Sequence, residues 1–405
     1  MAVAYNPFAP EVREDPYPFY KALRDEAPVH RVEPFGFYAV SRYEDVMGVL
    51  RQPELFSSTA IQSFLLGGML RGADQMDPEE RELFESPILI ATDPPEHARM
   101  RSLVNRGFMP RRIAALEPRI REITRRALDR IDPDGFDLVR DLAVPLPVTV
   151  IAELLGVDPE RMEDFKRWSD AIVTAISGTT PESRERVLGQ RGQFRHYFKE
   201  VIERRRREPR DDLVSVLIRA EEDLGALTPV QILGFTVLLL VAGNETTTNL
   251  LGNTMQALLR HPDQLEKVIA DPALVDGLVE EGLRYDSPVQ ALVRSPNRDV
   301  ELRGVEISKG SIVLVLFASA NRDERQFADP DRFAVTRDRR GHVAFGFGIH
   351  YCLGAALARL EARVAFEELL SRFRRFELLE ERVERLDSFL IRGPKSLRMR
   401  AGAVG

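Results

Sequence analysis

Hydrophobic side chains recur at intervals of three and four residues over much of this chain, with Arg and Glu between them. This spacing predicts amphipathic helices and is clearest over residues 113–131 and 353–373. Strand-like runs are short; the best are residues 37–41 and 312–318, and residues 300–307 form a weaker one. The pattern therefore predicts a mainly α protein with small β-sheets.

The best-marked helix begins at Thr228, because Pro229 suits a first helical turn and Gln231 completes a capping box. The next stop signal is Pro262, so the helix is expected to run for about 32 residues, or about 48 Å. A helix of this length that is apolar on most sides predicts a central core element. Polar residues interrupt this helix at positions 244–249. Because burying unpaired polar groups is costly, these residues are expected to have hydrogen-bond partners or a functional role.

Composition narrows the class of protein. The 405 residues are 44% hydrophobic and contain no repeat, low-complexity tract or long linker, so one domain covering residues 1–405 is expected. A net charge of −7 gives no support to nucleic-acid binding driven by phosphate neutralisation. The first fifteen residues lack the features of a signal peptide, and the longest apolar run, residues 235–243, is too short to span a bilayer. We expect a cytoplasmic protein without a membrane anchor.

Cys352 is the only cysteine, which excludes an intramolecular disulfide and a cysteine-rich zinc site. A lone cysteine is usually a small buried hydrophobe. Here it lies in the segment FGFGIHYCLG, residues 345–354, directly before a helical pattern. A helix N-terminus stabilises a thiolate, and Gly346, Gly348 and Gly354 allow the backbone to approach a flat partner.

Three kinds of site compete for this loop. A dinucleotide fingerprint fails because Tyr351 stands where the third glycine is required. A cysteine nucleophile activated by His350 is disfavoured, because such pairs are not normally adjacent in sequence. Ligation of a haem iron by Cys352 is the remaining interpretation.

The segment FGFGIHYCLG resembles the ligand loop of the cytochrome P450 superfamily, Phe-Gly-x-Gly-x-x-x-Cys-x-Gly, at every fixed position. The resemblance implies a single P450 fold in which a long central helix crosses a haem b. Cys352 would be the axial ligand of the iron, and Phe345, Gly346 and Gly354 would contact the cofactor.

The segment AGNETT, residues 242–247, resembles the oxygen-binding segment of the same family. The resemblance implies that the small Ala242 and Gly243 leave room for dioxygen, that Thr246 hydrogen-bonds oxygen, and that Glu245 relays protons. Many bacterial relatives have Asp at the position of Glu245, whose side chain is longer by one methylene group.

Two further groups of residues match the family in chain order. Glu281 and Arg284 form its Glu-x-x-Arg pair, and Arg332 is expected to close an ion network with them that supports the Cys352 loop. Four side chains that donate hydrogen bonds suit the two carboxylates of a haem. They are His97, Arg101, Arg294 and His350.

A cysteine thiolate on haem iron favours cleavage of the O–O bond, so the resemblance implies a monooxygenase that hydroxylates or epoxidises its substrate with O2 as co-substrate. Electrons would come from NAD(P)H only indirectly, through a ferredoxin or flavodoxin and its reductase. Arginines near the ligand loop are expected either to steer that partner or to form an ordinary solvated face. They are Arg337, Arg339 and Arg340.

A monomer is expected, and two alternative functions stay open. A peroxide-driven haem-thiolate peroxygenase would not need the Glu245 and Thr246 pair. A non-enzymatic haem-binding sensor would need neither that pair nor an electron partner.

The substrate pocket is expected to be lined mainly by apolar residues, which favours a hydrophobic small molecule such as a terpenoid, steroid, fatty acid or polyketide. Residue types do not rank these substrates. The expected lining residues are Leu65, Leu66, Leu238, Val241, Gln290, Leu292, Val293, Phe389 and Leu390.

Overall fold

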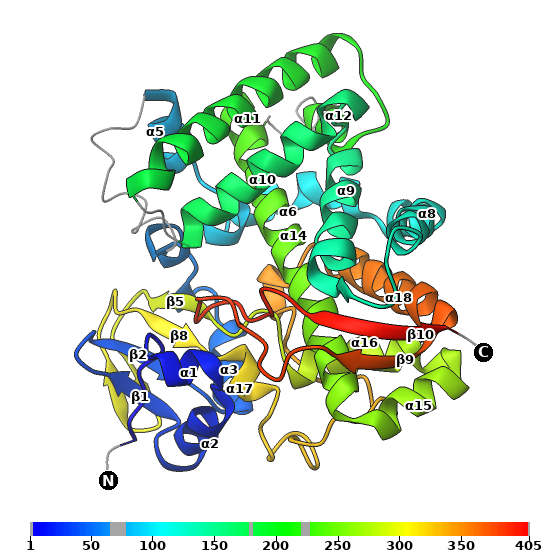
Figure 1. Ribbon diagram of the computed structural model, residues 1–405. Helices are drawn as coiled ribbons and strands as arrows, with labels where there is room; N and C mark the ends of the chain where they lie inside the picture. Colours follow the sequence, from blue (N-terminus) through cyan, green and yellow to red (C-terminus); the bar gives the residue numbers. More distant parts are fainter. Residues whose placement is uncertain (1–2, 65–77, 178–180, 220–226, 404–405) are drawn as a thin grey trace. The chain divides into compact units, whose positions relative to one another are not determined.

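The structure is a computed structural model that describes residues 3–64, 78–177, 181–219 and 227–403 (Figure 1). The described chain is mainly helical with three small sheets, which confirms the predicted fold class. It divides into two compact units. The first comprises residues 1–57, 114–146 and 246–405, and the second comprises residues 58–113 and 147–245. A single domain over residues 1–405 stays a prediction.

The regular secondary structure in the described part of the second unit is all helical. Its α-helices are α5 (Pro78–Glu85), α6 (Glu96–Asn105), α10 (Met162–Ser177), α11 (Pro181–Arg207) and α12 (Leu213–Arg219), with short 3-10 turns η2 (Leu89–Ala91), η3 (Arg106–Phe108) and η5 (Pro159–Arg161). Three helices cross the boundary between the units in sequence: α7 (Pro110–Ala115), α9 (Pro145–Leu154) and α14 (Pro229–Arg260).

The first unit contains the strands and the remaining helices. Its helices are α1 (Pro10–Glu14), α2 (Tyr17–Glu26), α3 (Tyr43–Leu50), α8 (Glu117–Leu128), the π-helical turn η4 (Val139–Ala143), α15 (Pro262–Ala270), η6 (Pro272–Leu274), α16 (Val275–Tyr285), α17 (Phe317–Ala320), η7 (Gly348–His350) and α18 (Ala355–Arg372). Its strands are β1 (Val29–Val32), β2 (Phe37–Val40), β3 (Phe56–Ser57), β4 (Phe136–Asp137), β5 (Leu292–Pro296), β6 (Val300–Leu302), β7 (Val305–Ile307), β8 (Val313–Val315), β9 (Phe373–Leu378) and β10 (Arg398–Ala403).

The largest sheet has the strand order β1-β2-β8-β5-β3, with only β2 and β8 parallel. Tyr38 pairs with Val313, and Val293 pairs with Leu314, so β8 is a central strand. All three residues of β8 are buried, and Val313 and Val315 belong to one hydrophobic cluster. Figure 1 shows α1, α2 and α3 beside this sheet.

Two strand predictions need correction. Residues 312–318 form strand only over Val313–Val315, and the chain turns into the short helix α17 at Phe317. Residues 300–307 form two strands, β6 and β7, joined at Arg303 and Gly304. Both residues have positive φ, 52° and 76°, as a tight hairpin turn requires.

One helix prediction also needs correction. The pattern over residues 113–131 is divided between α7 and α8, with Leu116 as the N-cap of α8. Pro118 lies in the first turn of α8, where its missing N–H breaks no helical hydrogen bond. The predicted helix over residues 353–373 is observed as α18, Ala355–Arg372.

The long helix α14 follows the prediction in start and length, with 32 residues from Pro229 to Arg260. The capping box is present: the Thr228 N–H donates to Gln231 Oε1 at 3.0 Å, and the Gln231 N–H donates to Thr228 Oγ1 at 3.1 Å.

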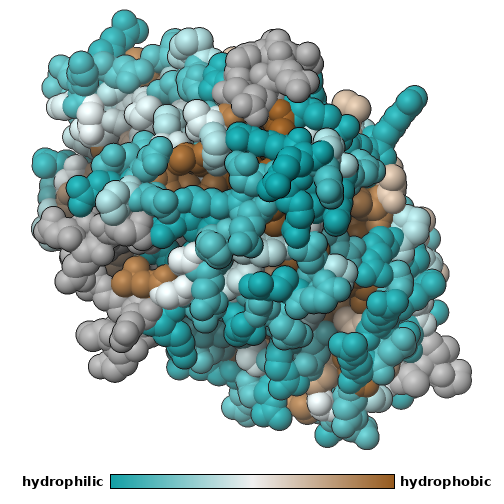
Figure 2. Space-filling model, turned by 90° about the horizontal axis from the view of Figure 1, so that it is seen from above, coloured by the Kyte–Doolittle hydropathy of each residue, from teal (hydrophilic) through white to brown (hydrophobic). Residues whose placement is uncertain are grey.

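By length and composition α14 is apolar enough to cross a membrane, a test that the core helix of a soluble protein also passes. Two of its buried polar groups have partners within the fold. The Asn244 amide donates to Ser169 Oγ, and the Thr248 hydroxyl donates to the Ala143 carbonyl. Hydrophilic residues predominate on the face shown in Figure 2, with small groups of hydrophobic ones among them. These observations favour a core helix.

Candidate haem-thiolate site

Cys352 is exposed on the loop that leads into α18. Its N–H donates to the Phe345 carbonyl at 2.9 Å, which closes the loop into a compact turn. Gly346 and Gly348 have φ of 67° and 70°, a left-handed conformation that glycine adopts without strain. Gly354 is the N-cap of α18, so Cys352 lies at the positive end of an 18-residue helix, where a thiolate is stabilised.

Gly348 brings the loop against the end of α3. A Cβ atom added at Gly348 would lie 3.1 Å from the Leu50 carbonyl oxygen. The neighbouring Arg51 guanidinium lies over the Phe347 ring, 5.4 Å from its centre. The glycine is therefore needed for both its φ and its close approach.

Replacing Gly348 by alanine is expected to lower the free energy of unfolding by about 1–3 kcal/mol, because the left-handed φ and the Leu50 contact both oppose a Cβ atom. Gly310→Ala is the matched control, since Gly310 has φ of 80° but no atom within 4 Å of an added Cβ. Urea unfolding of both variants separates the two effects. Equal decreases in the free energy of unfolding would show that the contact with Leu50 does not contribute to stability.

Asn321 anchors the segment that enters the loop. Its side-chain oxygen accepts a hydrogen bond from the Val343 N–H at 2.7 Å, and its amide donates to Ser287 Oγ at 2.8 Å. Asn321 is fully buried, so these bonds are sheltered from water.

Glu281 and Arg284 form a buried ion pair on α16, with two contacts of 2.8 Å. Arg284 also donates to three main-chain carbonyls in the segment before the ligand loop. They belong to Asn321, Pro330 and Arg332. The pair therefore fixes that segment to α16.

The expected role of Arg332 needs correction. Arg332 contributes its main-chain carbonyl, and no described carboxylate lies within ion-pair distance of its side chain. The second guanidinium on Glu281 is that of Arg337, at 3.2 Å. The motif identified the segment, but the turn after Phe333 determines which arginine points inward.

A second ion cluster supports the Phe345 ring. The Arg359 guanidinium lies 4.5 Å from the ring centre and pairs with Glu280 at 2.5 Å, while His342 approaches the same carboxylate at 2.8 Å. Burial alone would raise the pKa of Glu280, but the hydrogen bonds from His342 and Arg359 outweigh it and lower this pKa to about 2. Sequence reasoning missed this cluster because its members come from three distant segments.

The oxygen-segment residues lie midway along α14. Ala242 is exposed and Leu238 and Val241 are half-buried, although residues near both ends of this helix are buried. Protein atoms thus leave part of an apolar helix face uncovered, as contact with an apolar cofactor or substrate requires. Burial raises the pKa of Glu245 to about 7, so its carboxyl can release a proton near neutral pH.

Gly243 has a different role from the one expected. A Cβ atom there would lie 2.4 Å from Ile151 Cδ1, so the missing side chain allows α9 to pack closely. Gly243 therefore serves helix packing, which leaves Ala242 as the small residue available to a ligand.

The four expected haem-carboxylate contacts occupy both units. His97 and Arg101 lie four residues apart on α6, in the second unit. Arg294 on β5 and His350 in η7 belong to the first unit. Burial and the nearby Arg101 lower the pKa of His97, so its imidazole is favoured as a neutral donor.

Helix α6 begins at Glu96, with Pro95 in the cap position and no side-chain cap. Just before the helix, the Asp93 side chain accepts a hydrogen bond from the Ser58 N–H at 2.9 Å.

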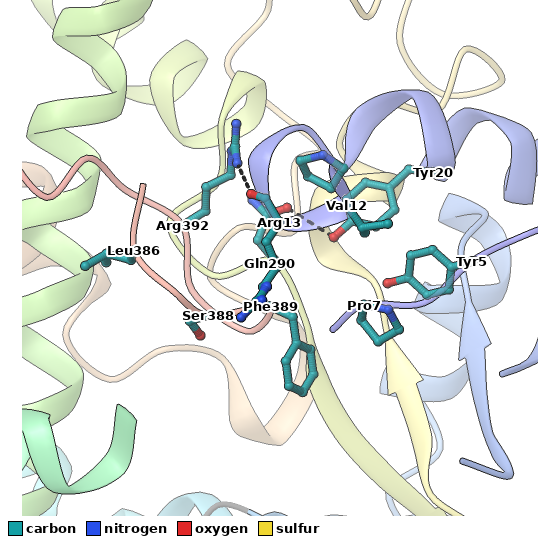
Figure 3. A pocket seen from close by; sticks show the side chains of 11 residues that line it. Tyr5, Pro7, Val12, Arg13, Tyr20, Gln290, Leu386, Ser388, Phe389 and Arg392 are labelled. Carbon is teal, nitrogen blue, oxygen red and sulfur yellow. Dashed lines mark hydrogen bonds between the residues drawn. The ribbon is translucent and has the colours of Figure 1, made fainter. Parts of the chain in front are cut away.

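The expected substrate-pocket residues are only partly brought together. Leu65 and Leu66 lie outside the described residues. The Gln290 N–H donates to the Leu390 carbonyl at 2.7 Å, which places these two segments side by side. Gln290 and Phe389 line a small pocket with Tyr5 and Tyr20 (Figure 3). Because the Gln290 side chain accepts from Tyr20 and donates to the Ser287 carbonyl, it serves packing there. On β5, Leu292 is half-buried and Val293 is buried.

The donor set fits a haem. Among the described residues, no group of three or more His, Cys, Asp or Glu side chains could hold a bare metal ion. A haem brings four nitrogen ligands of its own, so the exposed Cys352 thiol on a glycine-rich loop would be enough as the protein ligand.

Comparison with known proteins identifies the class. A sequence profile described as Cytochrome P450 matches residues 161–399. The chain belongs to the cytochrome P450 family, whose members include named monooxygenases, and it is an oxidoreductase that incorporates molecular oxygen.

Individual relatives match over nearly the whole chain. The cytochrome P450 monooxygenase PikC of Streptomyces venezuelae is 42% identical over 366 residues, which cover 88% of this chain and 84% of PikC. The structure of CYP109Q5 from Chondromyces apiculatus superimposes with a TM-score of 0.89 at 44% identity and covers 100% of both chains. CYP109E1 from Bacillus megaterium, in complex with corticosterone, gives 0.85 at 37% identity and covers 96% of this chain and 99% of its own.

Proposed function

We propose that this protein is a cytoplasmic haem-thiolate monooxygenase that hydroxylates or epoxidises an apolar, polycyclic small molecule, with electrons from a ferredoxin or flavodoxin and its reductase. The observation that carries the proposal is Cys352, exposed at the N-terminal end of α18 in a loop closed by its own backbone. Steroids are the first substrates to test, because CYP109E1, a structural relative, is described with corticosterone.

Different residues of this chain are proposed to bind the haem and to deliver protons. Cys352 would hold the haem iron, and His97, Arg101, Arg294 and His350 would bind the haem carboxylates. Thr246 would orient a hydrogen bond toward oxygen, and Glu245 would deliver protons to it. When bound, the haem supplies the activation of dioxygen.

The expected steering arginines have carboxylate partners. Arg337 is largely buried and pairs with Glu281. Arg339 pairs with Asp276, and Arg340 pairs with Asp338, on the exposed surface. Arg337 therefore serves the fold, and a steering role is proposed only for Arg339 and Arg340.

Replacing Thr246 by alanine is expected to divert most of the reducing equivalents from product to hydrogen peroxide, because proton delivery to oxygen is lost. Product formed per NADPH consumed should fall about tenfold or more in a reconstituted assay with a surrogate ferredoxin. Incorporation of ¹⁸O from ¹⁸O2 identifies the reaction. Full activity with peroxide alone, unaffected by Thr246→Ala, would favour a peroxygenase.

Glu245 gives the reaction a pH dependence. Since burial raises its pKa to about 7, the carboxyl donates below this pH and is ionised above it. Product per NADPH should therefore decline as the pH rises from 6 to 8. Glu245→Gln should be less active and lack this decline. The same pH step in both proteins would assign it to another group.

A further inference from the structure

A small pocket beside the turn of residues 386–392 has no part in the proposed reaction. Figure 3 shows side chains of the N-terminal segment and of this turn around it, among them Arg13, Ser388 and Arg392. All of its lining residues belong to the first unit. Its free space holds about one group of the size of a water molecule. Any ligand that fills this pocket is therefore small.

The polar groups of the pocket are mainly hydrogen-bond donors. The Nε atom of Arg13 is buried and has no hydrogen-bond partner among the described residues. Ser388 Oγ accepts from the N–H groups of Leu390 and Ile391, at 3.3 Å each, so its own proton is directed elsewhere. The side-chain oxygen of Gln290, which can only accept, is already bonded to the Tyr20 hydroxyl at 3.2 Å. A ligand that accepts hydrogen bonds suits these donors.

The charges around the pocket favour an anion. Arg392 lines the pocket and shares the buried carboxylate of Asp286 with Arg385, at 2.9 and 3.6 Å. The carboxylate that pairs with Arg13 is that of Asp387, whose side chain is 73% exposed and therefore well hydrated. Three guanidinium groups thus surround one buried carboxylate. Because uncompensated buried charge is costly, a bound negative charge would stabilise this arrangement.

We propose that this pocket binds a monovalent anion of the size of chloride. The anion accepts hydrogen bonds from Arg13 Nε and the Ser388 hydroxyl, and its charge offsets that of Arg392. Sulfate and phosphate, with four oxygen atoms each, exceed the free space of the pocket. The site itself does not depend on the proposed function.

The anion would connect two segments that the fold already brings together. The Arg392 guanidinium donates to the Arg13 carbonyl at 2.9 Å, and an anion adds a second link between the N-terminal segment and the turn. This turn contains Phe389 and Leu390, which are expected to line the substrate pocket. Anion binding should therefore hold these two residues in place and strengthen substrate binding. This consequence, unlike the site, rests on the proposed function.

The ³⁵Cl NMR line width of chloride tests the site directly. Carbon monoxide occupies the iron of the reduced, haem-loaded protein, so chloride cannot bind there. We expect wild type to broaden the chloride line and bromide to reverse the broadening. The effect should fall about fivefold or more in Arg13→Gln and in Ser388→Ala, which each remove one donor. Arg382→Gln is the matched control, because Arg382 is 82% exposed and pairs with Glu14. Equal broadening in wild type and both pocket variants would overturn the proposal.

Thermal unfolding in sodium chloride and in sodium gluconate of equal ionic strength gives a second readout. Chloride should raise the melting temperature of wild type and of Arg382→Gln by about 1–3 °C, because it binds only the folded state. Arg13→Gln should show no such rise. A rise of the same size in Arg13→Gln would contradict the proposed site.

Corticosterone titration in the same two salts tests the link to substrate binding. Its dissociation constant should be about threefold lower in chloride for wild type and unchanged by chloride for Arg13→Gln. A chloride effect of equal size in both proteins would refute the link. The carbon monoxide spectrum reports on the thiolate separately, so loss of the thiolate spectrum contradicts the proposed function and leaves the melting result as the test of the anion site.

Discussion

Replacing Cys352 by alanine is expected to abolish the strongly red-shifted Soret band of the reduced, carbon monoxide-bound protein, together with all monooxygenase activity. In the proposed function the Cys352 thiolate would be the one iron ligand from the protein, and its electron donation would favour cleavage of the O–O bond. The loss of activity should exceed about a thousandfold, since Cys352 is the only cysteine in the chain. Visible spectroscopy of the dithionite-reduced protein measures the first effect.

Cys352→His provides the control for haem binding. Imidazole also ligates haem iron, so this variant should retain cofactor while its spectrum changes to the histidine type. Because the chain has a single cysteine, thiol titration reports on Cys352 alone. A red-shifted band that survives in Cys352→Ala would show that the iron has a different ligand.

Replacing Glu281 by glutamine is expected to produce the largest loss of stability, about 3–5 kcal/mol in the free energy of unfolding. The side chains of Glu281 and Arg284 are each 2% exposed, and Arg337 approaches the same carboxylate. Glutamine keeps the shape but leaves two guanidinium groups in a poorly hydrated site without a negative charge. Loss of haem should accompany the loss of stability, since this pair holds the segment before the ligand loop.

Asp276→Asn on the same helix is the matched control. This substitution removes an exposed ion pair, in which the Arg339 side chain is 48% exposed and the Asp276 side chain is 55% exposed. It should lower the free energy of unfolding by less than about 1 kcal/mol. Urea unfolding followed by circular dichroism measures both variants. Similar losses for the two would mean that burial adds nothing to the Glu281 pair.

Local signals predicted the elements that carry the site. The capping box at Thr228 and the stop at Pro262 predicted α14 with its observed length, because caps and prolines act on neighbouring residues only. The helical pattern that follows Cys352 predicted a helix start there, and α18 begins at Ala355. Where turn residues were overlooked, as at Arg303 and Gly304, the prediction of one strand was wrong.

The class of protein could be read from local motifs, since the proposed thiolate ligand lies in one short segment and the proposed oxygen segment lies on one helix. The side chains that support these segments became known only from the folded structure. It placed Arg337 rather than Arg332 against Glu281, and it packed Gly243 against Ile151. These contacts join residues that are distant in sequence. Their partners are set by burial and by the path of the whole chain, which no local pattern encodes.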